Sequence, residues 1–148
     1  MTQLEMMTST ALLGSGIWLS GVHALNYVQL HDEAWPTSGG QRLVKTIDVS
    51  APYDDQWARG RTMLALGLTL TSAGVPAMLQ GDEWLESNPF NPSPDGSGRI
   101  DWAKKTTYAG VFEFYRRLIG FRTTLSPLYA SSAMHVFHVN EAGNVIGF

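Results

Sequence analysis

The sequence of 148 residues contains no cysteine. This absence excludes disulfide bonds, thiol nucleophiles and thiolate metal sites, and it leaves the cellular compartment undecided. Charged residues are also scarce, at 16% of the chain against about 25% in a typical soluble domain. This scarcity indicates elements covered on more than one side, or surface that is hidden by partner structure. The net charge of −3 gives no electrostatic reason to expect binding to nucleic acid.

The chain also lacks a long uninterrupted apolar run. The first 24 residues have no Lys or Arg before their apolar part, carry Glu5, and are interrupted by Gly14 and Gly16, which argues against a signal peptide. Residues 63–79 contain Gly, Pro, Ser and Thr, so a buried helix, turn and strand explain them better than a bilayer span of about 20 apolar residues. We therefore expect no membrane segment; without a convincing signal peptide the localisation stays unknown, with the cytoplasm favoured.

Apolar patterning predicts two strand–helix units. The strands are expected at residues 24–30, with polar Asn26 and Gln29 as exceptions, and at residues 75–80. A helix should start at Gln56, capped by Asp54 or Asp55, be apolar nearly all round toward its end, and finish at Gly74 before Pro76. Residues 1–14 are expected to form a short helix or an irregular lead-in. The polar passage after Trp35 is too long for a tight connection, which suggests a functional loop.

A second helix is predicted from Tyr108 to about Thr124, followed by a β-hairpin. The arginines of this helix, among them Arg122, are expected mainly off its apolar face, whose members are Val111, Phe112, Phe114, Tyr115, Leu118, Ile119 and Phe121. Residues 134–148 alternate with period two around an Asn/Gly-rich turn, which predicts the hairpin.

Acidic clusters follow both predicted strands. His31-Asp32-Glu33 comes after the first strand and Asp82-Glu83 after the second, and each cluster has a tryptophan nearby. Strands joined by a helical crossover run parallel, and the active groups of parallel sheets collect at the carboxyl ends of the strands. Carboxylates accept hydrogen bonds from sugar hydroxyls, flat aromatic rings stack on pyranose faces, and glycoside chemistry uses paired carboxylates. The pattern therefore favours a carbohydrate site.

The order and spacing of four motifs resemble the α-amylase superfamily, glycoside hydrolase family 13. "NYVQLHDEAW" resembles the region around the seventh strand of its (β/α)₈ TIM barrel, and "GVPAMLQGDEW" resembles the eighth strand. "RIDWAKKTTYAGVFEFYRRLIGFRTTLSPL" is similar to the following helical segment, and "MHVFHVNEAGNVIGF" to the opening of the all-β domain after the barrel. The His-Asp-Glu run also resembles branching enzymes.

The resemblance implies an α/β fold and two regions. Residues 1–128 would be the C-terminal portion of a (β/α)₈ barrel with two parallel strand–helix units, and residues 129–148 the start of a C-terminal β-sandwich-type domain. Asp32 would be the carboxylate that stabilises the oxocarbenium-like transition state. The residues that would bind substrate are His31, Glu33, Trp35, Asp82 and Trp84.

Structural alternatives remain for these residues. His31 could be a strand-end histidine bonded to a backbone carbonyl, and Asp82 could fix its loop rather than line a cleft. Trp35, Trp84 and Trp102 could pack within loops instead of stacking on sugar. Arg42 and Lys45 are expected to be solvated or bonded to loop backbone, and His135 and His138 to lie on the surface without a metal. No calcium site is identified, although many family members bind calcium.

The departure from the family pattern is large. The nucleophilic Asp and the acid/base Glu belong to the fourth and fifth barrel strands, which nothing in this chain matches. The chain alone is therefore predicted to be inactive, and to need the missing barrel segments or self-association to cover its strand edges. Its parent would hydrolyse or branch α-1,4-glucans with retention, and the sequence does not separate these reactions. A non-catalytic sugar-binding or structural α/β module is the alternative, and the DNA upstream of Met1 would discriminate the two.

Overall fold

The computed structural model describes residues 25–91, 96, 98–129 and 135–148. The predicted lead-in at 1–14 and the region tested for a signal peptide lie outside these residues. The elements in chain order are β1 (Leu25–Asn26), η3 (Pro36–Ser38), α2 (Leu43–Ile47), α3 (Gln56–Thr71), β2 (Val75–Pro76), η4 (Asp82–Trp84), α4 (Ala103–Thr107), α5 (Ala109–Thr124), η5 (Ser126–Leu128), β3 (His138–Asn140) and β4 (Val145–Gly147).

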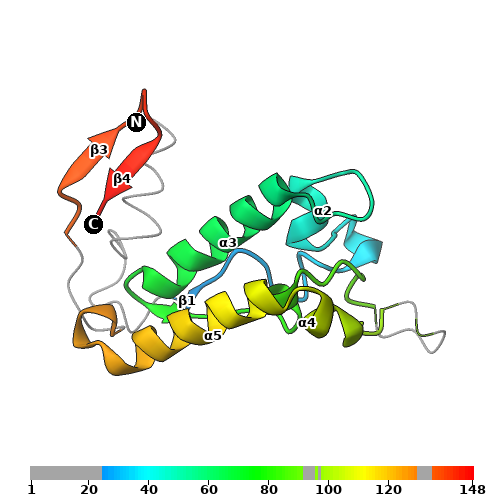
Figure 1. Cartoon of the computed structure of the whole chain (residues 1–148). Helices are drawn as coiled ribbons and strands as arrows, with labels where there is room; N and C mark the ends of the chain where they lie inside the picture. Colours follow the sequence, from blue (N-terminus) through cyan, green and yellow to red (C-terminus); the bar gives the residue numbers. More distant parts are fainter. Residues whose placement is uncertain (1–24, 92–95, 97, 130–134) are drawn as a thin grey trace.

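The strands β1 and β2 pair in parallel, as the sequence predicted. Leu25 lies opposite Val75 and Asn26 opposite Pro76, and α3 forms the crossover between them (Figure 1). Each strand has only two residues, so the predicted extents of 24–30 and 75–80 were too long. The reason is a shortage of ladder partners, because each strand has one neighbour in the described sheet and Pro76 has no N–H to donate.

Helix α3 begins where the sequence predicted. The Asp55 carboxylate accepts a hydrogen bond from the Ala58 backbone N–H at 2.6 Å, which satisfies one of the free donors at the helix start. The other end differs from the prediction, because the C-cap is Ser72 and Gly74 lies beyond it with φ at 110°. The helix is also less buried than expected, with the Leu64 side chain 64% exposed.

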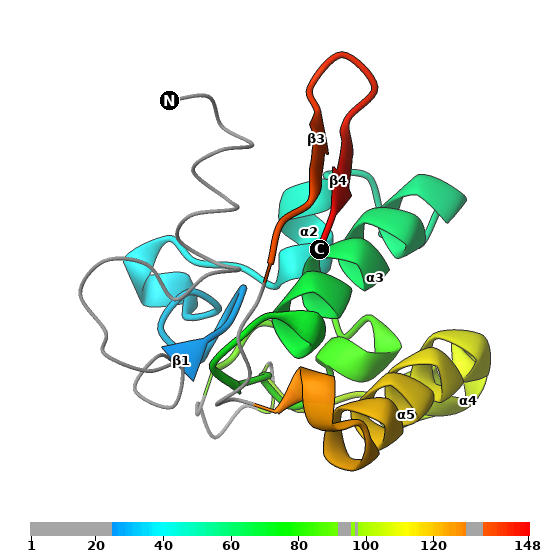
Figure 2. The same cartoon turned by 90° about the vertical axis from the view of Figure 1, so that its left-hand side faces the viewer.

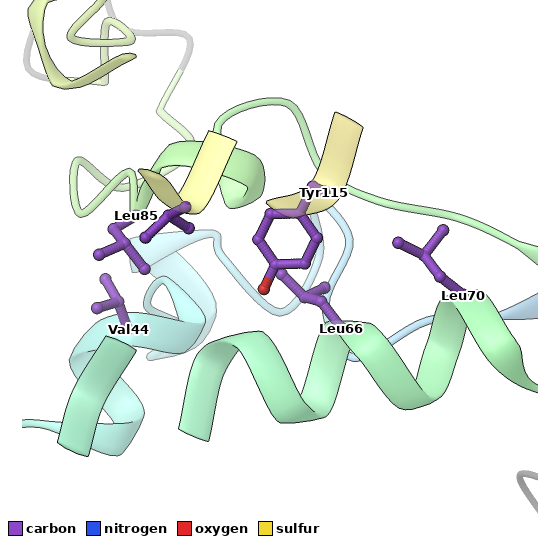
Figure 3. Packing of buried hydrophobic residues seen from close by; sticks show 6 residues of the cluster. Val44, Leu66, Leu70, Leu85 and Tyr115 are labelled. Atoms are coloured by element: carbon purple, nitrogen blue, oxygen red, sulfur yellow. The ribbon is translucent and has the colours of Figure 1, made fainter. Parts of the chain in front are cut away.

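The core lies between α3, α5 and the loops that follow the two strands. Its buried members are Val44, Leu66, Leu70, Leu85, Val111 and Tyr115. Figure 3 shows the Tyr115 ring reaching across to Leu66 on α3. The Tyr115 hydroxyl donates to the Thr62 carbonyl at 3.1 Å, so this buried phenol meets its hydrogen-bonding need on α3.

The burial of Arg122 differs from the prediction, which placed this residue off the buried face of α5. Its side chain is buried and donates to the carbonyls of Leu70 at 2.9 Å and Ser72 at 2.5 Å, and also to the Gly74 carbonyl. Phe121, which was predicted on the apolar face, is 55% exposed instead. The guanidinium is buried because the C-terminal end of α3 presents carbonyl oxygens that have no helical partner. Burial lowers the pKa of Arg122.

The passage after β1 is not structureless, because η3 and α2 occupy part of it. The passage after β2 likewise contains η4 and leads into α4. The two passages lie at the same end of the strand pair, since the Ala34 carbonyl accepts the Phe90 N–H at 3.0 Å. Among the described residues, no helix is both long and apolar enough to cross a bilayer.

The predicted hairpin is present as β3 and β4, which pair antiparallel with Val139 opposite Ile146. Its turn contains Asn144 at a φ of 51°, a left-handed conformation that asparagine tolerates better than most residues. Figures 1 and 2 show the hairpin as a separate two-stranded unit following η5. That it opens an all-β domain stays a prediction, and Met134 lies outside the described residues.

Candidate functional site

His31 and Asp32 lie side by side at the tip of the passage that follows β1. The imidazole Nε2 is 3.3 Å from the Asp32 carboxylate, and the two side chains are 55% and 83% exposed. His31 was alternatively expected to bond a backbone carbonyl, and the contact that the structure gives is with the Asp32 carboxylate instead. An exposed carboxylate beside a histidine is free to accept hydrogen bonds from hydroxyls in solution.

Aromatic side chains from both passages surround this pair. The edge of the His31 ring meets the Phe90 ring at a centroid distance of 5.8 Å, and Trp35 lies 6.0 Å from the same ring. Phe90 belongs to the passage after β2, so this group of His31, Asp32, Trp35 and Phe90, here called the rim, combines residues from both strand ends. The position of Phe90 was not predicted, because nothing in the sequence distinguishes it from any other loop phenylalanine.

A shallow hollow of about 490 Å³ adjoins the pair, and its lining is Asp32, Trp35, Thr37 and Ser38. The Ser38 hydroxyl donates to the backbone carbonyls of Trp35 at 2.9 Å and Asp32 at 3.2 Å, which closes the turn that carries them. Carboxylate, indole and hydroxyl groups thus line one open depression.

Glu33 turns back toward its own strand. Its carboxylate accepts the Leu30 backbone N–H at 2.8 Å, while the Ala34 N–H bonds the Leu30 carbonyl at 3.2 Å. The structure therefore gives Glu33 a part in shaping the loop, and its predicted contact with substrate stays a prediction.

Asp82 is buried and does not line the hollow. It is 3% exposed, and its carboxylate accepts hydrogen bonds from the Gln29 side chain and from the Leu79 N–H, the latter at 3.0 Å. Of the two alternatives that the sequence left open, this placement fits the one in which Asp82 fixes the loop. Burial raises the pKa of Asp82 to about 7, and the Gln29 hydrogen bond, the Arg42 charge and the Leu79 N–H oppose that rise.

Trp84 is buried as well, at 2% exposure. Its ring packs against Trp102 at 5.1 Å and Phe112 at 6.2 Å between centroids. The ring is covered in this structure, and this placement fits the alternative in which Trp84 packs within its loop; its predicted substrate contact stays a prediction. Trp102 is the exposed member of the cluster, with 57% of its surface accessible.

Three buried polar residues that hold the two passages in place were not predicted from the sequence. Gln29 is 3% exposed, Glu86 is 1% exposed and Arg42 is 1% exposed. The polar side chain of Gln29 within an apolar run was a usable signal, since a buried amide needs partners. Arg42 does bond loop backbone as expected, but its burial had no signal in the sequence. Burial also lowers the pKa of Arg42.

Glu86 holds the passage after β2 in shape. Its carboxylate accepts hydrogen bonds from Lys104 at 2.8 Å and from the Asp101 N–H at 2.6 Å.

In the part of the chain that the structure describes, no three His, Asp or Glu side chains gather in a manner suited to a metal ion.

Comparisons with known proteins find one curated enzyme and two solved structures to which this chain is similar. No protein-family model matches the sequence. The malto-oligosyltrehalose trehalohydrolase of Saccharolobus solfataricus is 31% identical over 72 residues, covering 49% of this chain and 11% of that protein. The pullulanase of Anoxybacillus sp. LM18-11, complexed with maltotetraose, matches with a TM-score of 0.68 and 21% identity, covering 84% of this chain and 19% of the pullulanase. A mutant pullulanase of Paenibacillus barengoltzii, also complexed with maltotetraose, matches with a TM-score of 0.63 and 22% identity, covering 81% and 19%.

These relatives are α-amylase-superfamily proteins. The resemblance of the chain to the α-amylase superfamily is confirmed. The parallel pair of strands and its helices are consistent with part of the barrel of that superfamily. The chain spans about a tenth to a fifth of the length of the relatives that it matches.

Proposed function

We propose that the chain is the part of an α-glucan-active glycosidase that carries one side of the sugar site. His31 binds sugar hydroxyls, Asp32 stabilises the transition state, and Trp35 provides an apolar face for a pyranose ring. The nucleophile and the acid/base would belong to segments outside this sequence, so the chain alone would not cleave a glucan. Hydrolysis and glucan transfer, including branching, remain equal candidates for the parent reaction, because both proceed through the same retaining chemistry.

The observation that carries this proposal is the meeting of two strand-end passages at one rim. The exposed His31–Asp32 pair comes from the passage after β1, and Phe90 beside it comes from the passage after β2. The resemblance to pullulanases complexed with maltotetraose adds support for an α-glucan oligosaccharide as ligand.

The chemistry of Asp32 follows from its exposure. A carboxylate that accepts hydrogen bonds from two neighbouring sugar hydroxyls does so more strongly as positive charge develops at the anomeric carbon, and this lowers the barrier. The Asp32 side chain is 83% exposed, so a ligand reaches it without rearrangement of the loop.

Titration of the chain with maltotetraose in a calorimeter tests the proposal. We expect measurable binding, with affinity reduced about tenfold or more by Asp32→Asn or by Trp35→Ala, since each removes a charged hydrogen bond or a stacking surface. Glu141→Gln and Trp57→Ala are matched controls, because both residues are exposed and neither lines the hollow or contacts His31, Asp32 or Phe90. Equal affinities in all five proteins would remove Asp32 and Trp35 from the site and favour a structural module.

A further inference from the structure

We propose that Gln29 and Asp82, held by Arg42, form a positioning unit that sets the His31 loop, residues 30–35, against the passage that follows β2. The inference rests on the proposed function, because it assigns the unit a purpose in sugar binding. None of the three residues belongs to the exposed rim, so their influence on a ligand would act through His31 and Phe90.

Gln29 stands two residues before His31 and uses both ends of its amide. The amide oxygen accepts the Leu43 backbone N–H at 2.6 Å, and the amide NH₂ donates to the Asp82 carboxylate. The orientation of the amide is therefore determined by its neighbours, since a backbone N–H needs an acceptor and a carboxylate needs a donor. The side chain ties the start of the His31 loop to α2 and to η4 simultaneously.

Asp82 is surrounded by donors. Besides Gln29, the Leu79 N–H donates to its second oxygen, and an Arg42 nitrogen lies 3.5 Å from the oxygen that Gln29 contacts. Arg42 also donates to the carbonyls of Gln80 at 3.0 Å and Asn88 at 2.9 Å. The Arg42 side chain, from the passage after β1, thus contacts three residues of the passage after β2. Arg42 is itself almost fully buried.

The geometry of the rim depends on this arrangement. His31 meets Phe90 edge to face, and the Ala34 carbonyl accepts the Phe90 N–H, so the two passages touch only a few residues from the buried unit. A change in the Gln29–Asp82 contact would shift one passage relative to the other. His31 would then leave the Phe90 ring, and a ligand bridging both passages would lose contacts.

A reversal of donor and acceptor provides the test. Gln29→Glu leaves two carboxylates facing each other, and Asp82→Asn leaves an amide NH₂ facing a donor. In the double variant Gln29→Glu/Asp82→Asn, the new carboxylate accepts from both Leu43 and the new amide, whose oxygen accepts from Leu79. The net charge of the unit is preserved when Asp82 is ionised. Gln41→Glu is the matched control for the first change, because Gln41 is exposed in the same passage.

The readouts are the NMR shifts of the His31 ring, which Phe90 perturbs through its ring current, and the affinity for maltotetraose. We expect each single variant to move the His31 signals and to weaken binding about tenfold, the coupling typical of residues in contact, and the double variant to restore both. Gln41→Glu should change neither.

Three results decide the matter. Single variants that lower the melting temperature but leave the His31 shifts and the affinity unchanged would show a structural role only and overturn the proposal. If the unmodified chain fails to bind maltotetraose, the proposed function fails, and the His31 shifts alone still test positioning. If the single variants do not fold, the double variant must fold with unmodified His31 shifts, and its failure to do so overturns the proposal.

Discussion

At the scale of residues, burial separates the predicted site residues into an exposed and a buried set. His31, Asp32 and Trp35 could be placed at a rim from the sequence, because an acidic cluster after an apolar strand marks a strand end. Asp82 and Trp84 had the same sequence signature and yet are buried. Their burial depends on Gln29, Arg42, Trp102 and Phe112, which are distant in sequence, so a local pattern could not reveal it.

The buried Asp82 carboxyl makes a prediction about stability and pH. Its pKa is about 7 in the folded chain and near 3.9 when unfolded, so the folded state holds the proton more tightly. The stability from this group is fully present below the unfolded value and is lost as the pH rises through about 7. We expect the free energy of unfolding to fall between pH 4 and pH 8, by up to about 4 kcal/mol from this group.

Urea unfolding of the unmodified chain and of Asp82→Asn across that range provides the measurement. The variant has no titrating group at this position, so its stability should change less with pH than that of the unmodified chain. Parallel pH profiles for the two proteins would show that Asp82 does not titrate in this window.

At the scale of elements, helices were easier to predict than strands. The Asp55 cap and the start of α3 follow from local hydrogen bonding, which the sequence displays directly. The lengths of β1 and β2 depend on neighbouring strands, and the face of α5 that is buried depends on α3. Arg122 is the clearest case, since the end of α3 supplies the carbonyls that bury its charge.

Arg122→Met should therefore destabilise the chain by about 3 kcal/mol, because it leaves buried carbonyl groups without a donor. Arg117→Met is the matched control on the same helix, since Arg117 forms only an exposed ion pair with Glu113, and such pairs contribute about 0–1 kcal/mol. Chemical denaturation of both variants gives the comparison. Equal losses would mean that the carbonyls at the end of α3 find other partners.

At the scale of the whole molecule, the low fraction of charged residues is accompanied by exposed apolar side chains. Leu25 and Val75, which pair in the short sheet, are 55% and 41% exposed, and Leu64 on α3 is 64% exposed. Apolar surface of this kind is typical of structure that packs against further elements. The sequence indicated this through its low charged fraction, but the elements that would cover these residues are not specified by any pattern within the chain.

The central claim is that the passages after β1 and β2 form one sugar-binding rim. NMR titration of the chain with maltotetraose tests it most directly, by following the ring signals of His31 and Phe90 together with those of His138 on the hairpin. We expect His31 and Phe90 to shift along one common binding curve while His138 stays unchanged. Shifts confined to other residues, or separate curves for His31 and Phe90, would contradict the claim.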